Sequence, residues 1–410
     1  MTAVRVIFVE PSFPNNQRQF VRALAEVGAT VIGVGESPQE ALDEELRSWM
    51  AHYHQVGSVV DVGAMTEVVR WVQGKVWVDR IETTIEAHTL PVAQVRERCT
   101  IPGTSVRTAW LCRDKPSMKD ALREAGVPTA ASAAVQTADE VWAFANAVGY
   151  PIVLKPRTGA GALDTTRVDN RDELEAALAM FGRQGVASIA VEEFVEGHEG
   201  FYDTMAVDGH APLDFVSHYY PNVLEAMRTR WISPQFVSTN RVDSVPEYAE
   251  LRELGHRVSE TLGIGTSATH MEWFFGPKGL KFSEIGCRPP GVGAWDLYSA
   301  GNDLDLYREW ANAIVHGKVS TRPSRRFASG IIALRPDRDG QIAGYSGVDE
   351  VQTKYGEWVL DAHLPHPGTP TQPPEAGYMA NAYVRMRHPD YDVLRGLLDD
   401  VGRTVQVHAT

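Results

Sequence analysis

Residues 269–291, THMEWFFGPKGLKFSEIGCRPPG, carry the pattern that decides the fold of this chain. Apolar residues alternate on both sides of the Gly-Pro-Lys-Gly segment at 276–279, which is typical of a β-hairpin. The expected turn is a three-residue loop at 277–279 with Gly279 in the left-handed region. In that register Glu272 lies directly opposite Glu284, and residues paired in this way share a face with Cβ atoms roughly 4.5–5.5 Å apart.

The two opposed carboxylates predict a metal site. Like charges at this spacing repel each other, and a bound cation removes the repulsion. Carboxylate oxygens suit Mg²⁺, which commonly takes one or two of them and completes its shell with water and substrate phosphate. Glu272 and Glu284 are therefore candidate ligands of Mg²⁺, with Mn²⁺ as a second candidate. The alternatives are that both side chains face water, or that the register slips by one residue and separates them.

A second segment has the composition of a phosphate-binding loop. Lys155 ends the apolar strand predicted at 152–154, and PRTGAGA follows it at residues 156–162. A positive side chain followed by backbone N–H groups with little side-chain obstruction suits phosphate. The loop is not of the Walker type, because no Gly-Lys-Ser/Thr opens a helix. A plain connection between two elements would have the same composition, so phosphate binding is one of two interpretations.

A third segment, VEEFVEGHE at residues 191–199, combines a strand end with acidic residues. Two glutamates end the predicted strand, and another acid, Glu199, follows the turn glycine Gly197 by two residues. Such a segment can present backbone groups to the edge of a purine and a carboxylate to ribose hydroxyls. The alternative is an edge strand that leaves the sheet into a solvated acidic turn.

Taken in order, these segments resemble the ATP-grasp superfamily, especially carboxylate-amine ligases such as D-alanine:D-alanine ligase and the L-amino acid ligases. The resemblance extends over about residues 104–293 and includes RDKPSMK at 113–119. It implies that ATP is bound by the following residues: Lys115 and Lys155 at the phosphates, Gly159, Ala160 and Gly161 in the loop that closes over them, Glu192, Glu193, Phe194 and Val195 in the adenine hinge, and Glu199 at the ribose.

The resemblance also implies which residues take part in catalysis. Lys155 and Arg288 would lie at the transferred phosphoryl group, Glu272 and Glu284 would bind the metal, and His270 would contact the substrate. His270 shares a strand face with Glu272, although a single strand histidine is often only a packed or exposed residue. Arg228 and Arg230 lie between the hinge and the hairpin, where they would bind an acidic substrate group or be solvated.

Two features depart from the family pattern. Many relatives have asparagine two residues after the second metal-binding acid, whereas this chain has Gly286. We therefore expect water to complete a comparatively weak metal shell. The dense glycine loop and the histidine-rich pattern of biotin carboxylase are also absent, which makes activation of bicarbonate for biotin a weaker interpretation.

The whole chain is predicted to be an α/β and α+β multidomain protein with an ATP-grasp fold. Strands at residues 4–9 and 30–34 alternate with helices at 17–27 and 65–72, and a further apolar stretch follows at 76–78. This alternation predicts an open parallel sheet, a Rossmann-like domain that lacks the glycine-rich turn of dinucleotide-binding folds. The expected units are an N-terminal α/β domain at 1–103, two ATP-grasp subdomains at 104–195 and 196–325, and a mostly β C-terminal segment at 326–410 with one helix near 391–399.

The function implied by the resemblance is an ADP-forming ligase that makes an amide or peptide bond through an acyl phosphate. The partners would be small molecules, a carboxylate and an amine, with a homodimer as one possible assembly. The formal charge of -14 gives no reason to expect nucleic acid or anionic membranes as partners. Three cysteines without metal-type spacing and no visible targeting segment suggest the cytoplasm. Carboxylation through carboxyphosphate and nucleotide binding without turnover are the alternatives.

Overall fold

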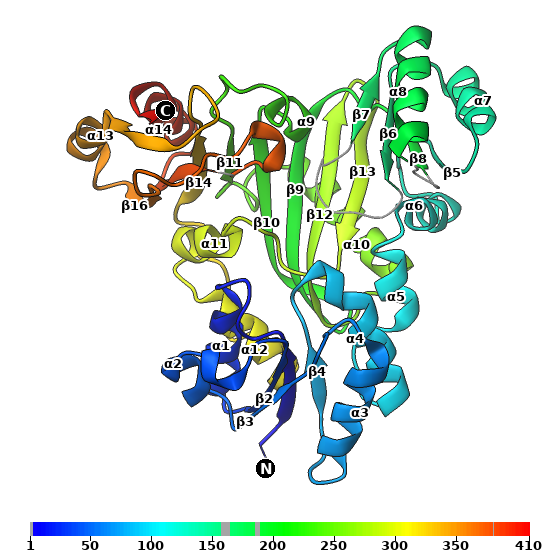
Figure 1. Ribbon diagram of the computed structural model, residues 1–410, viewed down its shortest axis with the longest axis vertical. Coiled ribbons are helices and arrows are strands. Elements are labelled where there is room, and N and C mark those ends of the chain that lie inside the picture. The colour runs from blue at the N-terminus through cyan, green and yellow to red at the C-terminus, as the bar shows by residue number, and fades with distance from the viewer. Residues whose placement is uncertain (1–2, 157–164, 185–188, 380) are drawn as a thin grey trace.

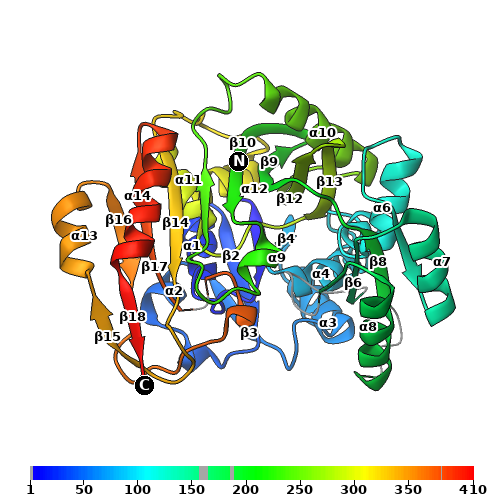
Figure 2. The ribbon, with the colours of Figure 1, turned by 90° about the horizontal axis from the view of Figure 1, so that it is seen from above.

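The computed structural model describes residues 3–156, 165–184, 189–379 and 381–410. The described residues form four sheets, of which the largest has eight strands and runs through the middle of the molecule (Figure 1). The N-terminal sheet lies at one end of it. The sheet of β5 to β8 and the C-terminal segment lie on opposite sides of the molecule, as Figure 2 shows.

The N-terminal sheet is parallel, with the strand order β3-β2-β1-β4. Alternate residues of β1 contribute to two cores: Val6 and Phe8 pack with α1 and α12, whereas Ile7 and Val9 pack with α3 and α4. A central parallel strand needs apolar residues on both faces for this reason. The elements are β1 (Arg5–Val9), α1 (Gln17–Glu26), β2 (Thr30–Gly35), η1 (Gln39–Ala41), α2 (Glu44–Ser48), β3 (His52–Gln55), α3 (Val62–Gln73), β4 (Arg80–Glu82), α4 (Glu86–Cys99) and α5 (Val106–Leu111).

The prediction that the apolar residues 76–78 form a strand of the N-terminal sheet is wrong. The fourth strand begins at Arg80, where Ile81 pairs with Ile7, and Trp77 is 60% exposed. The edge strand β3 was not anticipated, because its sequence His-Tyr-His-Gln is polar and has no apolar alternation.

The small sheet has the order β5-β8-β6-β7 and carries two helices. A side chain caps the N-terminus of each of these helices, and at Thr137 the reciprocal bond from Glu140 completes a capping box. The Thr137 side chain accepts from the backbone N–H of Glu140, and the Asn170 side chain accepts from that of Glu173. The elements are α6 (Lys115–Glu124), which leads into the sheet, β5 (Ser132–Val135), α7 (Ala138–Val148), β6 (Ile152–Pro156), β7 (Thr166–Val168), α8 (Arg171–Gln184) and β8 (Ile189–Glu193).

The large sheet is antiparallel and has the order β13-β12-β9-β10-β11-β14-β17-β16. One of its faces packs against α10, and the other packs against α11 and α12. The elements before the C-terminal segment are β9 (His198–Val207), β10 (His210–Tyr220), α9 (Val223–Ala226), β11 (Gln235–Ser238), α10 (Glu247–Leu262), β12 (Ser267–Gly276), β13 (Gly279–Gly286), α11 (Ala294–Asn302) and α12 (Leu306–His316).

The C-terminal segment continues the large sheet through β14, β17 and β16. The helix expected near 391–399 is present at residues 391–404, and a second helix of eight residues at 348–355 was not expected. Among the described residues no helix combines the length and the apolar composition needed to cross a bilayer. The elements are β14 (Ala328–Leu334), β15 (Ile342–Ser346), α13 (Val348–Tyr355), β16 (Val359–His363), η2 (Pro374–Ala376), β17 (Ala382–His388), α14 (Tyr391–Thr404) and β18 (Gln406–Ala409).

The hairpin of β12 and β13 has the predicted pairing of Glu272 with Glu284 but a different turn. Gly276 pairs with Gly279, so two residues rather than three form the loop, and Gly279 has the expected left-handed conformation, with φ of 77°. The register then shifts by one residue between Glu272 and Trp273, leaving Ser283 as an extra residue in β13. This β-bulge restores the opposition of the two glutamates.

Candidate active site

A pocket of about 450 Å³ lies between the small sheet and the β12–β13 hairpin. It is lined by residues that the sequence had pointed to from four separate segments. These are Lys115, Lys155, Glu192, Glu193, Phe194, Val195, Glu199, Glu272 and Glu284. Gly159, Ala160 and Gly161 lie outside the described residues. Arg288 and His270 do not line the pocket but lie at the adjoining end of the hairpin, where His270 pairs with Gly286.

Two lysines converge on one glutamate at the base of the pocket. The Nζ atoms of Lys119 and Lys155 are each 2.7 Å from Oε2 of Glu192. Burial alone would raise the pKa of Glu192, but the two ammonium groups lower it to about 2. Burial likewise opposes the charge of Lys155, yet Glu192 and Glu284 raise its pKa. The pocket therefore holds fixed positive charge, as a triphosphate requires.

Lys119 was not identified from the sequence. It is 1% exposed, and burial lowers its pKa to about 8 although Glu192 opposes the shift. Its position four residues after Lys115 places both side chains on the same side of α6, and this spacing is a signal that could have revealed it.

Glu272 and Glu284 form a buried pair of like charges. Burial, followed by the charges of Glu284 and Glu199, raises the pKa of Glu272 to about 8. Glu284 differs because Lys115, 3.2 Å away, and Lys155 outweigh burial and lower its pKa. A divalent cation between the carboxylates would remove the repulsion, so the two side chains fit the implied Mg²⁺. No third His, Cys, Asp or Glu side chain completes a metal-binding group with them in the part of the chain described.

His270 is oriented by a buried carboxylate that the sequence did not reveal. Its Nδ1 lies 2.7 Å from Oδ1 of Asp203, and the hydroxyl of Tyr298 donates to the other oxygen of Asp203 at 2.5 Å. The Nε2 atom of His270 is consequently turned toward Glu272, 3.9 Å from Oε1. Asp203 can thus fix both the orientation and the tautomer of the imidazole.

Arg288 and Gly286 both lie against Glu86, a residue of the N-terminal unit at the start of α4. Nε of Arg288 is 2.9 Å from Oε2 of Glu86. A Cβ atom placed on Gly286 would lie 3.0 Å from the same oxygen. A side chain at residue 286 would therefore have to displace Glu86. The glycine found where many relatives have asparagine gives room to this carboxylate.

The hinge segment passes very close to the hairpin turn. A Cβ atom on Gly276 would lie 2.0 Å from the carbonyl oxygen of Glu196, and Gly197 has φ of 144°. Glycine is required at both positions, because backbone atoms fill the space of a side chain. Beyond the hinge, the N–H of Val223 donates to Oε2 of Glu199 at 2.7 Å. Burial raises the pKa of Glu199 to about 7.

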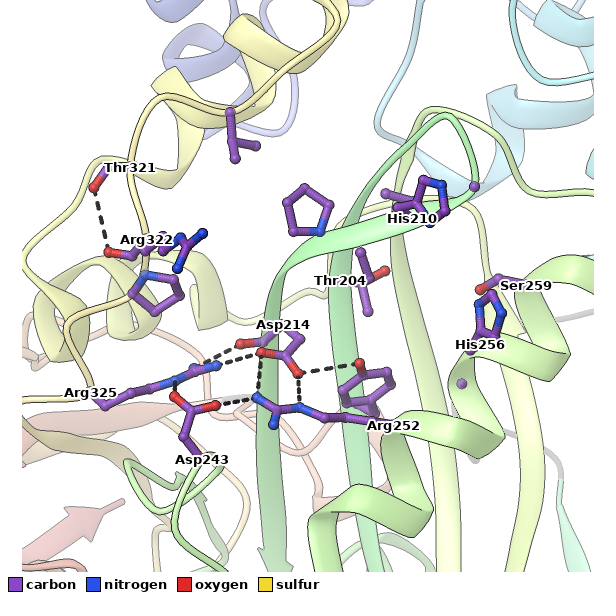
Figure 3. A pocket seen from close by; sticks show the side chains of 18 of the residues that line it. Thr204, His210, Asp214, Asp243, Arg252, His256, Ser259, Thr321, Arg322 and Arg325 are labelled. Atoms are coloured by element: carbon purple, nitrogen blue, oxygen red, sulfur yellow. Dashed lines mark hydrogen bonds and ion pairs between the residues drawn. The ribbon is translucent and has the colours of Figure 1, made fainter.

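A larger cavity of about 940 Å³ lies elsewhere, between the β9–β10 hairpin, α10 and residues 319–325 (Figure 3). Four of its charged side chains are paired with one another. Arg252 and Arg325 each contact the carboxylates of both Asp214 and Asp243. This network joins α10 and the 319–325 segment to the sheet. None of the residues predicted to bind ATP or metal lines this cavity.

Comparison with known proteins gives matches across this site. The family described as carbamoyl-phosphate synthase L chain, ATP binding domain, matches residues 114–201. The L-arginine-specific L-amino acid ligase of Bacillus subtilis is 26% identical over 324 residues, which cover 77% of this chain and 76% of that protein. The alanine–anticapsin ligase of Bacillus subtilis is 27% identical over 231 residues, or 50% of this chain and 47% of that protein.

The fold also has close structural relatives. The crystal structure of the L-amino acid ligase from Bacillus licheniformis superimposes with a TM-score of 0.77, covers 100% of both chains and is 16% identical in sequence. At that level of identity the match establishes a shared fold. It includes the N-terminal sheet, the two sheets around the pocket and the C-terminal segment.

Proposed function

Because this chain is a member of the ATP-grasp superfamily of ATP-dependent ligases, we propose that it joins a carboxylate to an amine through an acyl phosphate. The products would be an amide or peptide, ADP and phosphate. The observation that carries the proposal is that Lys155, Glu272 and Glu284 line one pocket. Lys155 lies within the segment that matches an ATP-binding domain. The fold predicted from the sequence is confirmed by the structural relatives.

We assign the nucleotide to this pocket, with its base at the hinge and its phosphates at the lysines. Oε1 of Glu192 is buried and has no hydrogen-bond partner among the described residues, so it can accept from an exocyclic amine of adenine. The backbone of Glu193 to Val195 lines the same region, and Glu199 would accept from ribose hydroxyls. Lys115 and Lys155 would contact phosphate oxygens. The two subdomains that form the pocket correspond to residues 104–195 and 196–325 in this proposal.

The metal would be held by Glu272 and Glu284. When bound there, Mg²⁺ neutralises charge on the phosphate oxygens and helps to orient them. The two carboxylates are fixed by the hairpin register, while Lys115 and Lys155 keep Glu284 ionised. Mn²⁺ has the same preference for carboxylate oxygen and is expected to substitute.

The reaction follows from positioning and electrostatics. A carboxylate oxygen of the first substrate attacks the γ-phosphorus of ATP and ADP leaves, and the amine of the second substrate then attacks the acyl carbon and phosphate leaves. Lys155 and Arg288 would stabilise the negative charge that is transferred. His270, held by Asp203, would contact the substrate at the end of the hairpin.

The substrates that we infer are amino acids. The relatives that cover the pocket are named as ligases acting on L-arginine and on alanine with anticapsin, which supports an amino acid as one or both partners. We place the enzyme in the cytoplasm. Its three cysteines have no metal-type spacing and suggest no disulfide framework, which fits a reducing compartment. A homodimer is the assembly that we propose to test first.

A screen for products tests the proposed function. The protein is incubated with ATP, MgCl₂ and pooled amino acids, and ADP release is measured alongside mass spectra of the products. We expect ADP release that depends on amino acids and a new ion with the mass of two substrates less one water. ADP release that depends on bicarbonate would instead indicate carboxylation, and ATP binding without ADP release would indicate a nucleotide-binding protein.

A further inference from the structure

We propose that Arg228 contacts the terminal phosphate of ATP and stabilises its transfer. This inference rests on the proposed function only in taking the 450 Å³ pocket as the nucleotide site. Arg228 lies on the loop between α9 and β11 and lines that pocket together with Lys155, Glu272 and Glu284. It therefore approaches the site from the large sheet, whereas Lys155 approaches from the small one.

The guanidinium group of Arg228 contacts the backbone next to the strand that pairs with the Lys155 strand. Its Nη2 donates to the carbonyl oxygen of Thr165 at 3.2 Å. Thr166 pairs with Leu154 in the β6–β7 ladder, so Thr165 lies across from Lys155. Arg228 and Lys155 both line the pocket, and the contact with Thr165 places the Arg228 guanidinium at the edge of this pair of strands.

The other cations of the site are already paired with carboxylates. Lys119 and Lys155 contact Glu192, Lys115 contacts Glu284 and Arg288 contacts Glu86. Arg228 has no carboxylate within ion-pair distance in residues 3–156, 165–184, 189–379 and 381–410. Among these residues its charge is left without an acidic partner, and its solvent-exposed position suits the outer end of the nucleotide better than the buried adenine.

The loop that carries Arg228 is held from both sides, as a binding residue requires. Nη1 of Arg335 donates to the carbonyl oxygen of Thr229 at 2.9 Å and also to that of Ala226. Arg230 is tied to Asp339 at 2.7 Å and does not line the pocket. A fixed backbone reduces the conformational entropy that is lost when Arg228 closes on a phosphate.

The test compares ATP with ADP, which lacks the terminal phosphate. Nucleotide affinities of wild type, Arg228→Gln, Arg228→Lys and Arg107→Gln are measured by calorimetry in MgCl₂ without amino acids. We expect Arg228→Gln to weaken ATP roughly tenfold and to leave ADP within about twofold, because a charge-assisted contact to one phosphate is lost. Arg228→Lys should recover part of the ATP affinity, and Arg107→Gln, a control on the exposed side of α5 away from the pocket, should bind both nucleotides like wild type.

Equal weakening of ATP and ADP in Arg228→Gln would overturn the proposal, since it would mean that Arg228 only holds the pocket in shape. Unchanged ATP affinity with a raised KM for an amino acid substrate would overturn it too, by assigning Arg228 to a substrate acid group. The comparison needs no turnover. A wild type that binds ATP but ligates nothing contradicts the proposed function and still allows this test.

Discussion

Glu284→Gln is expected to reduce kcat by roughly 10²–10³-fold while ATP still binds, because one negative charge is removed from the metal shell and the shape of the side chain is kept. Adenine and ribose contacts lie elsewhere in the pocket and should be unaffected. Turnover and ATP affinity are measured across a Mg²⁺ titration. The loss of turnover should be partly offset at high Mg²⁺.

The same variant should still fold in the absence of metal, with a stability close to that of wild type. Glu284 is one of the charges that raise the pKa of Glu272 to about 8, so the substitution relieves a like-charge contact across the strands. The ion pair with Lys115 is lost at the same time, which limits the gain. Glu253→Gln, on the exposed side of α10, is the matched control. Normal turnover of Glu284→Gln at low Mg²⁺ would show that Glu284 is not a metal ligand.

Lys155→Ala is expected to lower ATP affinity by one to two decades. A hydrogen bond to a charged group contributes about 1.5–3 kcal/mol, and Lys155 is the cation at the end of the strand that leads into the pocket. The substitution also leaves Glu192 with Lys119 as its remaining ammonium partner, so the pKa of Glu192 should rise from its value of about 2. Equilibrium binding of ATP gives the first effect directly.

Lys75→Ala provides the control for Lys155→Ala. The Nζ atom of Lys75 lies 3.8 Å from the centre of the Trp71 ring on the N-terminal unit, away from the pocket. This variant removes the same charge and should bind ATP as wild type does. Equal ATP affinity in the two variants would refute the assignment of Lys155.

The hairpin shows how far local sequence patterns predict a site. The opposition of Glu272 and Glu284 is correct, although the turn is one residue shorter than expected and a bulge at Ser283 compensates for the difference. The sequence contains a signal for the bulge. The alternation of apolar residues in β13 is interrupted between Phe282 and Ile285, where two residues instead of one separate the buried side chains. Register prediction from apolar alternation therefore needs the phase of both strands, as well as the length of the turn.

Local sequence patterns could not predict contacts between elements that are far apart in the chain. Nothing near Gly286 in the sequence indicates that Glu86 fills the adjoining space, and nothing near His270 indicates Asp203. These partners are separated by 200 and 67 residues, and hydrophobic periodicity specifies which face of an element is buried without specifying what packs against it. The expected weak metal shell at Gly286 stays a prediction, now with Glu86 as the side chain nearest to the vacant position.

The measurement that tests the central claim most directly follows oxygen from the carboxylate substrate to phosphate. The substrate found by screening is labelled with ¹⁸O in its carboxyl group and turned over with ATP, and the nucleotide and phosphate products are analysed by mass spectrometry. Attack of the carboxylate on the γ-phosphate predicts ADP together with inorganic phosphate that carries a single labelled oxygen. Label recovered in AMP with release of pyrophosphate, or unlabelled phosphate, would contradict the acyl-phosphate mechanism.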